Sequence, residues 1–256
     1  MIFHKLNFSN TLVPLIFLIL VSFSQTTIAG CDSPPGPRVN WSGCDKAGVD
    51  LSGQDLRGAV MIETNLSGAK LDKAILHDAD LGFANFSQAS LKKLKAKNTR
   101  WVGANFTQAD LSGARLSGGS LSRSIFKQAK ANNARFDGTE FYNANLSQAV
   151  FDQAVFTHSV LDLVIAQQSS FVGADFSQAR LDKADFEESS LVQAKFNKAK
   201  LRQANLVDAD LSQADLSGAD LSDADILGAK LDQAVLANTL WIDRRRCRPL
   251  SVGKCQ

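Results

Sequence analysis

The sequence predicts an all-β solenoid, a fold in which one short unit is repeated along the chain. From Leu51 to Trp241 every fifth residue is apolar and nearly always large, with no insertion, which defines 39 central positions. Of these, 21 are Leu and 11 are Phe, and the residue two positions earlier is Ala in 26 repeats. A helix needs apolar residues about every 3.6 positions and a strand about every 2, so neither has this period. Two inward residues followed by a polar corner describe one side of a coil.

Two neighbouring repeats show the unit most clearly, at 209–213 (Ala-Asp-Leu-Ser-Gln) and 214–218 (Ala-Asp-Leu-Ser-Gly). They resemble the pentapeptide-repeat family, whose motif is Ala-(Asp/Asn)-Leu followed by two variable residues, and the resemblance covers about three quarters of the chain. It implies a right-handed, quadrilateral parallel β-helix (solenoid) with about 20 residues per coil. The repeats would then form about ten coils, and a strand spacing of about 4.8 Å predicts a rod roughly 47 Å long.

Stacking of successive coils is expected to supply the core, because one coil cannot bury its own apolar residues. Residues twenty apart would then form columns along the rod. Two predicted columns consist of phenylalanines: Phe136, Phe156, Phe176 and Phe196, and Phe86, Phe106 and Phe126. Each buried Leu or Phe contributes on the order of 1.5–3 kcal/mol.

Three central positions hold Ala in place of a large residue: Ala96, Ala131 and Ala166. In two of these repeats the other inward residue is enlarged, to Leu94 and Val164, which conserves volume inside a fixed core. The repeat of Ala131 has no such compensation.

The chain divides into four segments. Residues 1–30 have a basic start, a short apolar run and small residues at their end, which is typical of a secretory signal peptide. The mature protein is therefore expected to be exported, into the periplasm if the cell is bacterial. Residues 31–48 are predicted to form an N-terminal cap, 49–241 the β-helix and 242–256 a C-terminal cap. Caps are expected because an open β-helix exposes unpaired strand edges.

Four cysteines lie in two local pairs, Cys31 with Cys44 and Cys247 with Cys255. Disulfides persist outside the cytoplasm, so this clustering favours one bridge in each cap, although three connectivities remain formally open. An alternative places the cleavage site before Cys31, because Ile-Ala-Gly-Cys resembles a bacterial lipobox. Cys31 would then carry a lipid, and the protein would be an envelope lipoprotein anchored to the membrane. Without lipidation no membrane contact is expected.

We find no candidate for a catalytic residue, a metal site or a cofactor. His77 and His158 occupy outward positions far apart, without a third ligand at a suitable spacing. Serines are plentiful, but a filled rod offers no cleft that would hold a base beside one of them. The formal net charge is only +2, so the sequence gives no reason to expect a nucleic-acid partner. The basic stretch 92–100 and the acidic stretch 208–225 are both interpreted as solvated faces.

One set of outward positions departs from the polar pattern. The residue before the centre is apolar in four successive repeats, and one neighbouring outward residue is apolar as well. We call this set the apolar belt: Val150, Val155, Val160, Leu163 and Ile165. Contiguous exposed apolar residues often mark contacts. The belt is therefore predicted to bind an unidentified protein partner, or a second copy of this chain in a homo-oligomer.

These observations favour an exported structural scaffold that binds protein and has no catalytic activity. The alternative within the same family is a gyrase-binding protein that mimics DNA. Export and a near-neutral charge both disfavour it, because mimicry of DNA needs a strongly acidic surface.

Overall fold

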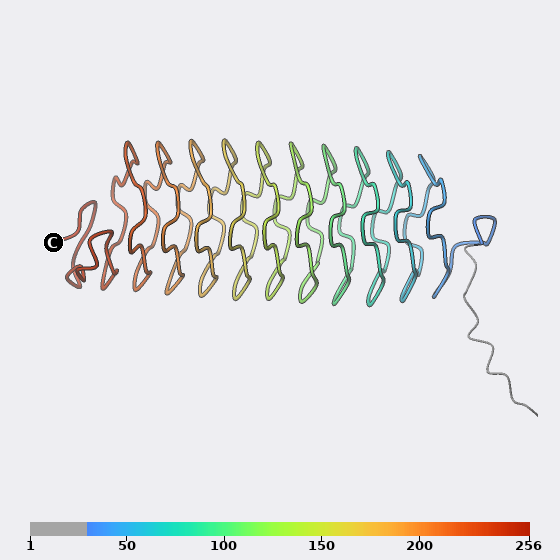
Figure 1. Ribbon diagram of the computed structural model, residues 1–256, viewed down its shortest axis with the longest axis horizontal. Coiled ribbons are helices and arrows are strands. Elements are labelled where there is room, and N and C mark those ends of the chain that lie inside the picture. Colours follow the sequence, from blue (N-terminus) through green and yellow to red (C-terminus); the bar gives the residue numbers. More distant parts are fainter. Residues whose placement is uncertain (1–29) are drawn as a thin grey trace, which may run out of the picture.

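The computed structural model describes residues 30–256 as a straight rod of stacked coils (Figure 1). The predicted signal peptide lies almost entirely outside these residues. Within them there is no helix and no extended strand. Adjacent coils are instead joined by isolated parallel bridges between residues twenty apart, from Asn40↔Val60 to Asp220↔Leu240. In this part of the chain, no helix is long and apolar enough to span a membrane.

Turns follow one another too closely for longer strands to form. Every fifth residue from Arg38 to Asn238 has a positive φ, whether or not it is glycine. The carbonyl of most centres accepts a hydrogen bond from the residue three positions later, as Leu51 does from the amide of Gln54 at 3.1 Å. A positive φ at the third of four residues is the signature of a type II turn. Each side of the coil is therefore one bridged residue between two turns.

The core consists of the central residues, which are buried without exception from Leu51 to Leu221. Phe156 stacks between Phe136 and Phe176, with ring centroids 5.1 and 4.9 Å away and planes within 14° of parallel. The predicted phenylalanine columns and the register of the repeat are therefore confirmed.

Serine and threonine replace Ala at several inward positions without leaving a polar group unpaired. The hydroxyl of Thr64 donates to the carbonyl oxygen of Trp41 at 2.7 Å, and that of Ser159 donates to Phe136 at 2.7 Å. In both cases the accepting carbonyl belongs to the central residue of a repeat on the preceding coil, 23 residues earlier. A buried hydroxyl is tolerated here because it joins two coils, whereas an unpaired one would be costly.

The Ala substitutions at the centre follow the expected exchange of volume in two of three cases. Leu94 and Val164 are fully buried beside Ala96 and Ala166 in their repeats. The third repeat stays uncompensated, and the residue after its Ala, Asn132, has a buried Oδ1 atom without a hydrogen-bond partner among the described residues.

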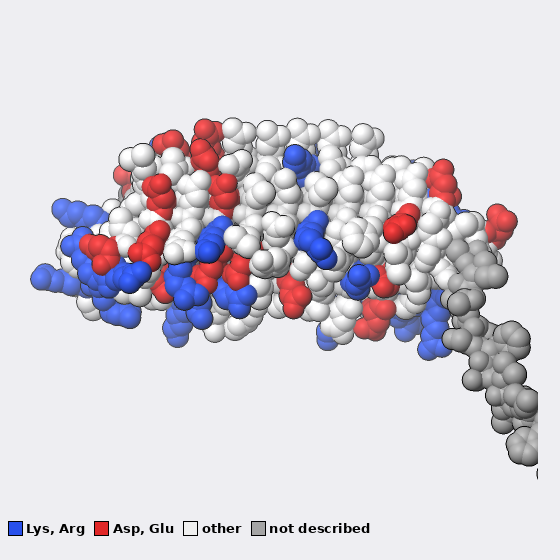
Figure 2. All heavy atoms as spheres, viewed as in Figure 1, with Lys and Arg blue, Asp and Glu red and all other residues white. Residues whose placement is uncertain are grey.

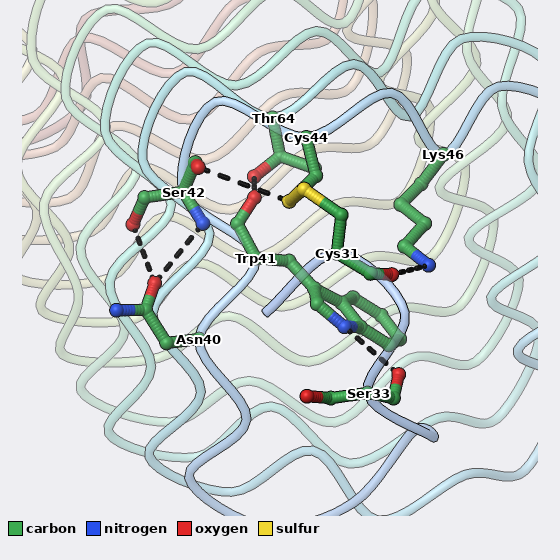
Figure 3. The surroundings of a disulfide bond; sticks show 8 residues. All are labelled: Cys31, Ser33, Asn40, Trp41, Ser42, Cys44, Lys46 and Thr64. Atoms are coloured by element: carbon green, nitrogen blue, oxygen red, sulfur yellow. Dashed lines mark hydrogen bonds between the residues drawn. A yellow bond between two sulfur atoms is a disulfide. The ribbon is translucent and has the colours of Figure 1, made fainter. Parts of the chain in front are cut away.

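At the N-terminal end, the repeat register begins earlier than expected, at Asn40 inside the segment predicted as a cap. Trp41 is buried at a central position, and its indole Nε1 donates to the carbonyl of Ser33 (Figure 3). Lys46 occupies the next centre, with Nζ 4.5 Å from the Trp41 ring and 2.5 Å from the carbonyl oxygen of Cys31. Cys31 and Cys44 form a disulfide beside them, so the chain before the first coil is fastened across the end of the core.

At the C-terminal end, the chain folds back over part of the last coil (Figure 1). Antiparallel bridges join Val235 to Val252 and Leu240 to Arg246. The Cys247–Cys255 disulfide closes this segment. The other two sides of the last coil have no such cover, and their central residues there are only partly buried.

Candidate binding surfaces of the rod

The corners of the coil explain why the family motif prefers Asp or Asn before the centre. The side-chain oxygen of that residue accepts the backbone N–H two positions later, as Asp210 does from Ser212 at 2.9 Å and Asn205 from Val207 at 3.1 Å. This Asx turn shapes the start of the type II turn. The hydrogen bonds from Ser212 hold the pKa of Asp210 below its ordinary value.

A ladder of glutamine amides runs along one corner. Each Nε2 atom donates to the Oε1 atom one coil further on, at 2.9 to 3.3 Å, and the last amide donates to a carboxylate oxygen of Glu188 at 2.8 Å. The glutamines are Gln88, Gln108, Gln128, Gln148 and Gln168. All of them have φ near +60°. The apolar columns alone do not reveal this ladder, although the spacing of twenty between the glutamines is visible in the sequence.

The apolar belt lies on one coil, as its sequence positions require, and it is exposed to different degrees. Leu163 and Ile165 are 38% and 39% exposed, whereas the three valines are half-buried. Each valine is bridged on at least one side to a residue with a long charged side chain, for example Val155 to Arg135. The methylene stems of such side chains can cover an apolar neighbour. Tyr142, which is 48% exposed and lies on the coil before Leu163, was not anticipated.

The two histidines do not approach each other. They lie on the same corner four coils apart, which is about 19 Å at the usual spacing of stacked strands. The Nδ1 atom of His77 accepts the backbone N–H of Lys97 at 2.9 Å. Residues 30–256 contain no group of three side chains that could hold a metal ion.

Charged residues are unevenly distributed along the rod. On the face shown in Figure 2 they gather toward the C-terminal end, and a broad uncharged band covers much of the remainder. In sequence, residues 61–140 contain twelve Lys and Arg but only seven Asp and Glu. Residues 171–241 contain seven Lys and Arg but twelve Asp and Glu. The small net charge of the chain therefore conceals a basic half and an acidic half.

Two family models match the repeats identified in the sequence. One, described as pentapeptide repeats in eight copies, matches residues 47–82, 84–128 and 120–157, and the other, a pentapeptide repeat region, matches 164–241. The chain belongs to the pentapeptide-repeat family. Proteins of this family are generally non-catalytic scaffolds. The parallel bridges between residues twenty apart agree with the predicted β-helix. Among curated proteins none matches this chain.

Solved structures of pentapeptide-repeat proteins are similar to this chain. HetL of the cyanobacterium Nostoc, a protein involved in heterocyst differentiation regulation, is 25% identical; the match covers 82% of this chain and 92% of HetL, with a TM-score of 0.37. Full-length QnrB1, a plasmid-mediated fluoroquinolone resistance protein, is 22% identical; the match covers 77% of this chain and 83% of QnrB1, with a TM-score of 0.37. A pentapeptide-repeat protein of the Arabidopsis thaliana thylakoid lumen is 25% identical; the match covers 53% of this chain and 70% of that protein, with a TM-score of 0.18.

Proposed function

We propose that this pentapeptide-repeat protein is an exported, non-catalytic scaffold that binds another protein through the sides of its rod. Its interior is filled by stacked side chains, so only the outer faces and the two ends remain for binding. Export agrees with the two disulfides, since such bonds form in oxidising compartments.

The apolar belt is the observation that carries this proposal. It replaces the usual polar outward residues on all four sides of one coil, and two of its members are more than a third exposed. Polar or charged residues occupy the bridged positions on either side, such as Lys130 before Val150 and Asp185 after Ile165. An apolar centre with a polar rim is the usual anatomy of a protein–protein interface.

A gyrase-binding DNA mimic is the weaker alternative. Mimicry of DNA requires a continuous acidic surface, whereas the half of this rod between residues 61 and 140 is basic. That half would repel a DNA-binding groove, which is itself positively charged.

A variant with charged residues in the apolar belt tests the proposal. Val155, Val160 and Ile165 would each be replaced by Asp, and the variant compared with the parent in pull-down from an envelope extract and in self-association by sedimentation. We expect loss of the captured partner or of the oligomer, because three carboxylates within the contact would have to be desolvated.

The matched control replaces Ser120, Ser190 and Asn205 by Asp, which adds the same charge at the same position of the repeat, away from the residues bridged to the belt. Binding should persist in this control. If the belt variant remains folded and neither readout changes, the belt is not a binding site.

A further inference from the structure

Four cations converge on one hollow of the rod surface. The hollow has a volume of about 480 Å³ and lies at a corner of the coil, between two sides. Its walls are formed by Lys73, Lys93, Lys95 and Arg115, with Gly113 between them. All four cations are exposed, and among the described residues no acidic side chain lines the hollow.

These cations have no internal counter-ion. None of the nine ion pairs within residues 30–256 includes any of the four. Elsewhere a cation commonly pairs with an acid on the neighbouring coil, as Arg100 does with Asp80 at 2.7 Å. The nearby Asp72 is already engaged, because its Oδ1 atom accepts hydrogen bonds from Ser90 and from the amide of Lys92.

A second hollow on the rod shows the contrast. Its volume is about 390 Å³, and its walls include Asp182, Arg202, Asp223 and Arg244. Here each arginine pairs with an aspartate, so that Lys183 is the one lining cation outside the ion pairs of the described residues, whereas all four cations of the first hollow are outside them.

Stacking of the coils places the unpaired cations in costly positions. Lys95 is bridged to Arg115, and Arg115 is bridged in turn to Arg135, so like charges lie directly opposite one another on successive coils. Such pairs lower stability. Arg135 is compensated by its ion pair with Asp137, but Lys95 and Arg115 have no such pair. Local conflicts of this kind are expected at functional or strained sites.

The glycine shapes the hollow. Gly113 occupies a turn position that carries a side chain in most repeats. Its φ is +68°, and φ is positive at this position in the neighbouring turns as well. A Cβ atom there would lie 3.4 Å from the Cγ atom of Lys93. The lysine stem therefore lies over the glycine along the rod, and both residues line the hollow.

We propose that this hollow binds a soluble anion that carries two or more phosphate or sulfate groups. The planar guanidinium of Arg115 presents paired donors that match such oxygens, and the three lysines supply further charge. Among residues 30–256 no apolar side chain lines the hollow, which favours a soluble anion over a lipid head group, because interfacial binding needs apolar groups to insert.

Calorimetric titration of the mature, disulfide-bonded chain with inorganic triphosphate tests this site. The parent should bind one triphosphate, and binding should weaken as salt is added. The double variant Lys93→Gln and Lys95→Gln should lose affinity about tenfold or more, because charge-assisted hydrogen bonds are removed. Replacing the same two lysines by Arg should preserve binding.

Lys198 and Lys200 provide a closely matched control. They hold the same two positions of a repeat about five coils further along the rod. Lys198 lies over Gly218 as Lys93 lies over Gly113, because a Cβ atom added to Gly218 would lie 3.5 Å from the Cγ atom of Lys198. Lys200, however, is bridged to Asp220. Changing both to Gln removes the same charge and should alter affinity less than about twofold.

Two outcomes would overturn the proposal. One is equal loss of affinity in the two Gln variants, which would mean that only overall charge matters, and the other is no binding by the parent. A second experiment measures binding of the parent to vesicles of phosphatidylglycerol. If the parent binds them through Lys93 and Lys95 but does not bind triphosphate, the ligand is a lipid head group and the soluble anion is wrong.

Discussion

At the scale of single residues, position within the repeat decides whether a side chain is core or surface. Phe156 is fully buried between two parallel rings, whereas Gln153, three residues earlier, is an exposed turn residue. The spacing of five predicted this division correctly. It did not predict that Gln153 has φ +59°, because Gln has no intrinsic preference for the left-handed region and only the closed coil imposes it.

Truncation of Phe156 to Ala should lower the free energy of unfolding by about 3–5 kcal/mol, since it removes two stacked contacts and leaves a cavity. Gln153→Ala should change it by less than about 0.5 kcal/mol, because the side chain is on the surface. Urea denaturation followed by circular dichroism measures both values.

Repeat arrays can unfold in parts, so hydrogen exchange of the central coils should accompany the denaturation curves. Equal midpoints for the two variants, with equal protection of the central amides, would contradict the assigned register.

At the scale of the turn, the motif residue Asp or Asn has a role that composition alone could not reveal. From the sequence, these residues are predicted only to be polar corners. The structure shows that Asp210 closes an Asx turn with Ser212, and that Asn205 does the same with Val207. The glutamine ladder was equally hidden, because its members are twenty residues apart and only stacking brings their amides together.

The lowered pKa of Asp210 predicts a contribution to acid sensitivity. A carboxyl group whose folded pKa lies below its unfolded value of about 3.9 stabilises the protein above that value. This stabilisation is lost as the pH falls through the folded pKa. Asp210→Asn keeps the accepting oxygen and removes the titrating group.

We therefore expect Asp210→Asn to be slightly less stable than the parent at neutral pH, because the ionised carboxylate is gone, and to lose less stability on acidification below about pH 4. Urea midpoints at a series of pH values measure the difference. Val235→Ala, at the same outward position five repeats further along and without a titrating group, serves as the control and should follow the parent's pH dependence. An identical pH dependence for Asp210→Asn and the parent would show that this turn contributes nothing to acid sensitivity.

At the scale of the whole molecule, the sequence predicted the solenoid but not the pattern of charge on it. The basic stretch 92–100 was interpreted as one solvated face. In the structure Lys92 and Arg100 pair with acids, whereas Lys93 and Lys95 join cations from the coils on either side. Neighbours on adjacent coils are distant in sequence, so a linear reading groups the wrong residues.

The two ends of the rod lead to the last prediction. Each disulfide joins cysteines whose Cα atoms are close, 5.5 Å for Cys31–Cys44 and 4.9 Å for Cys247–Cys255. A rod of roughly 47 Å separates the two pairs, and a disulfide cannot span such a distance between folded ends. Protein isolated from the producing cell should therefore lack the leader, contain both local disulfides and accept a thiol-alkylating reagent only after reduction. Intact mass and peptide mapping check all three points together. A diacylglycerol on Cys31 would contradict the predicted pairing, because the same sulfur cannot carry a lipid and a disulfide, and a link between Cys44 and Cys247 would contradict the folded rod.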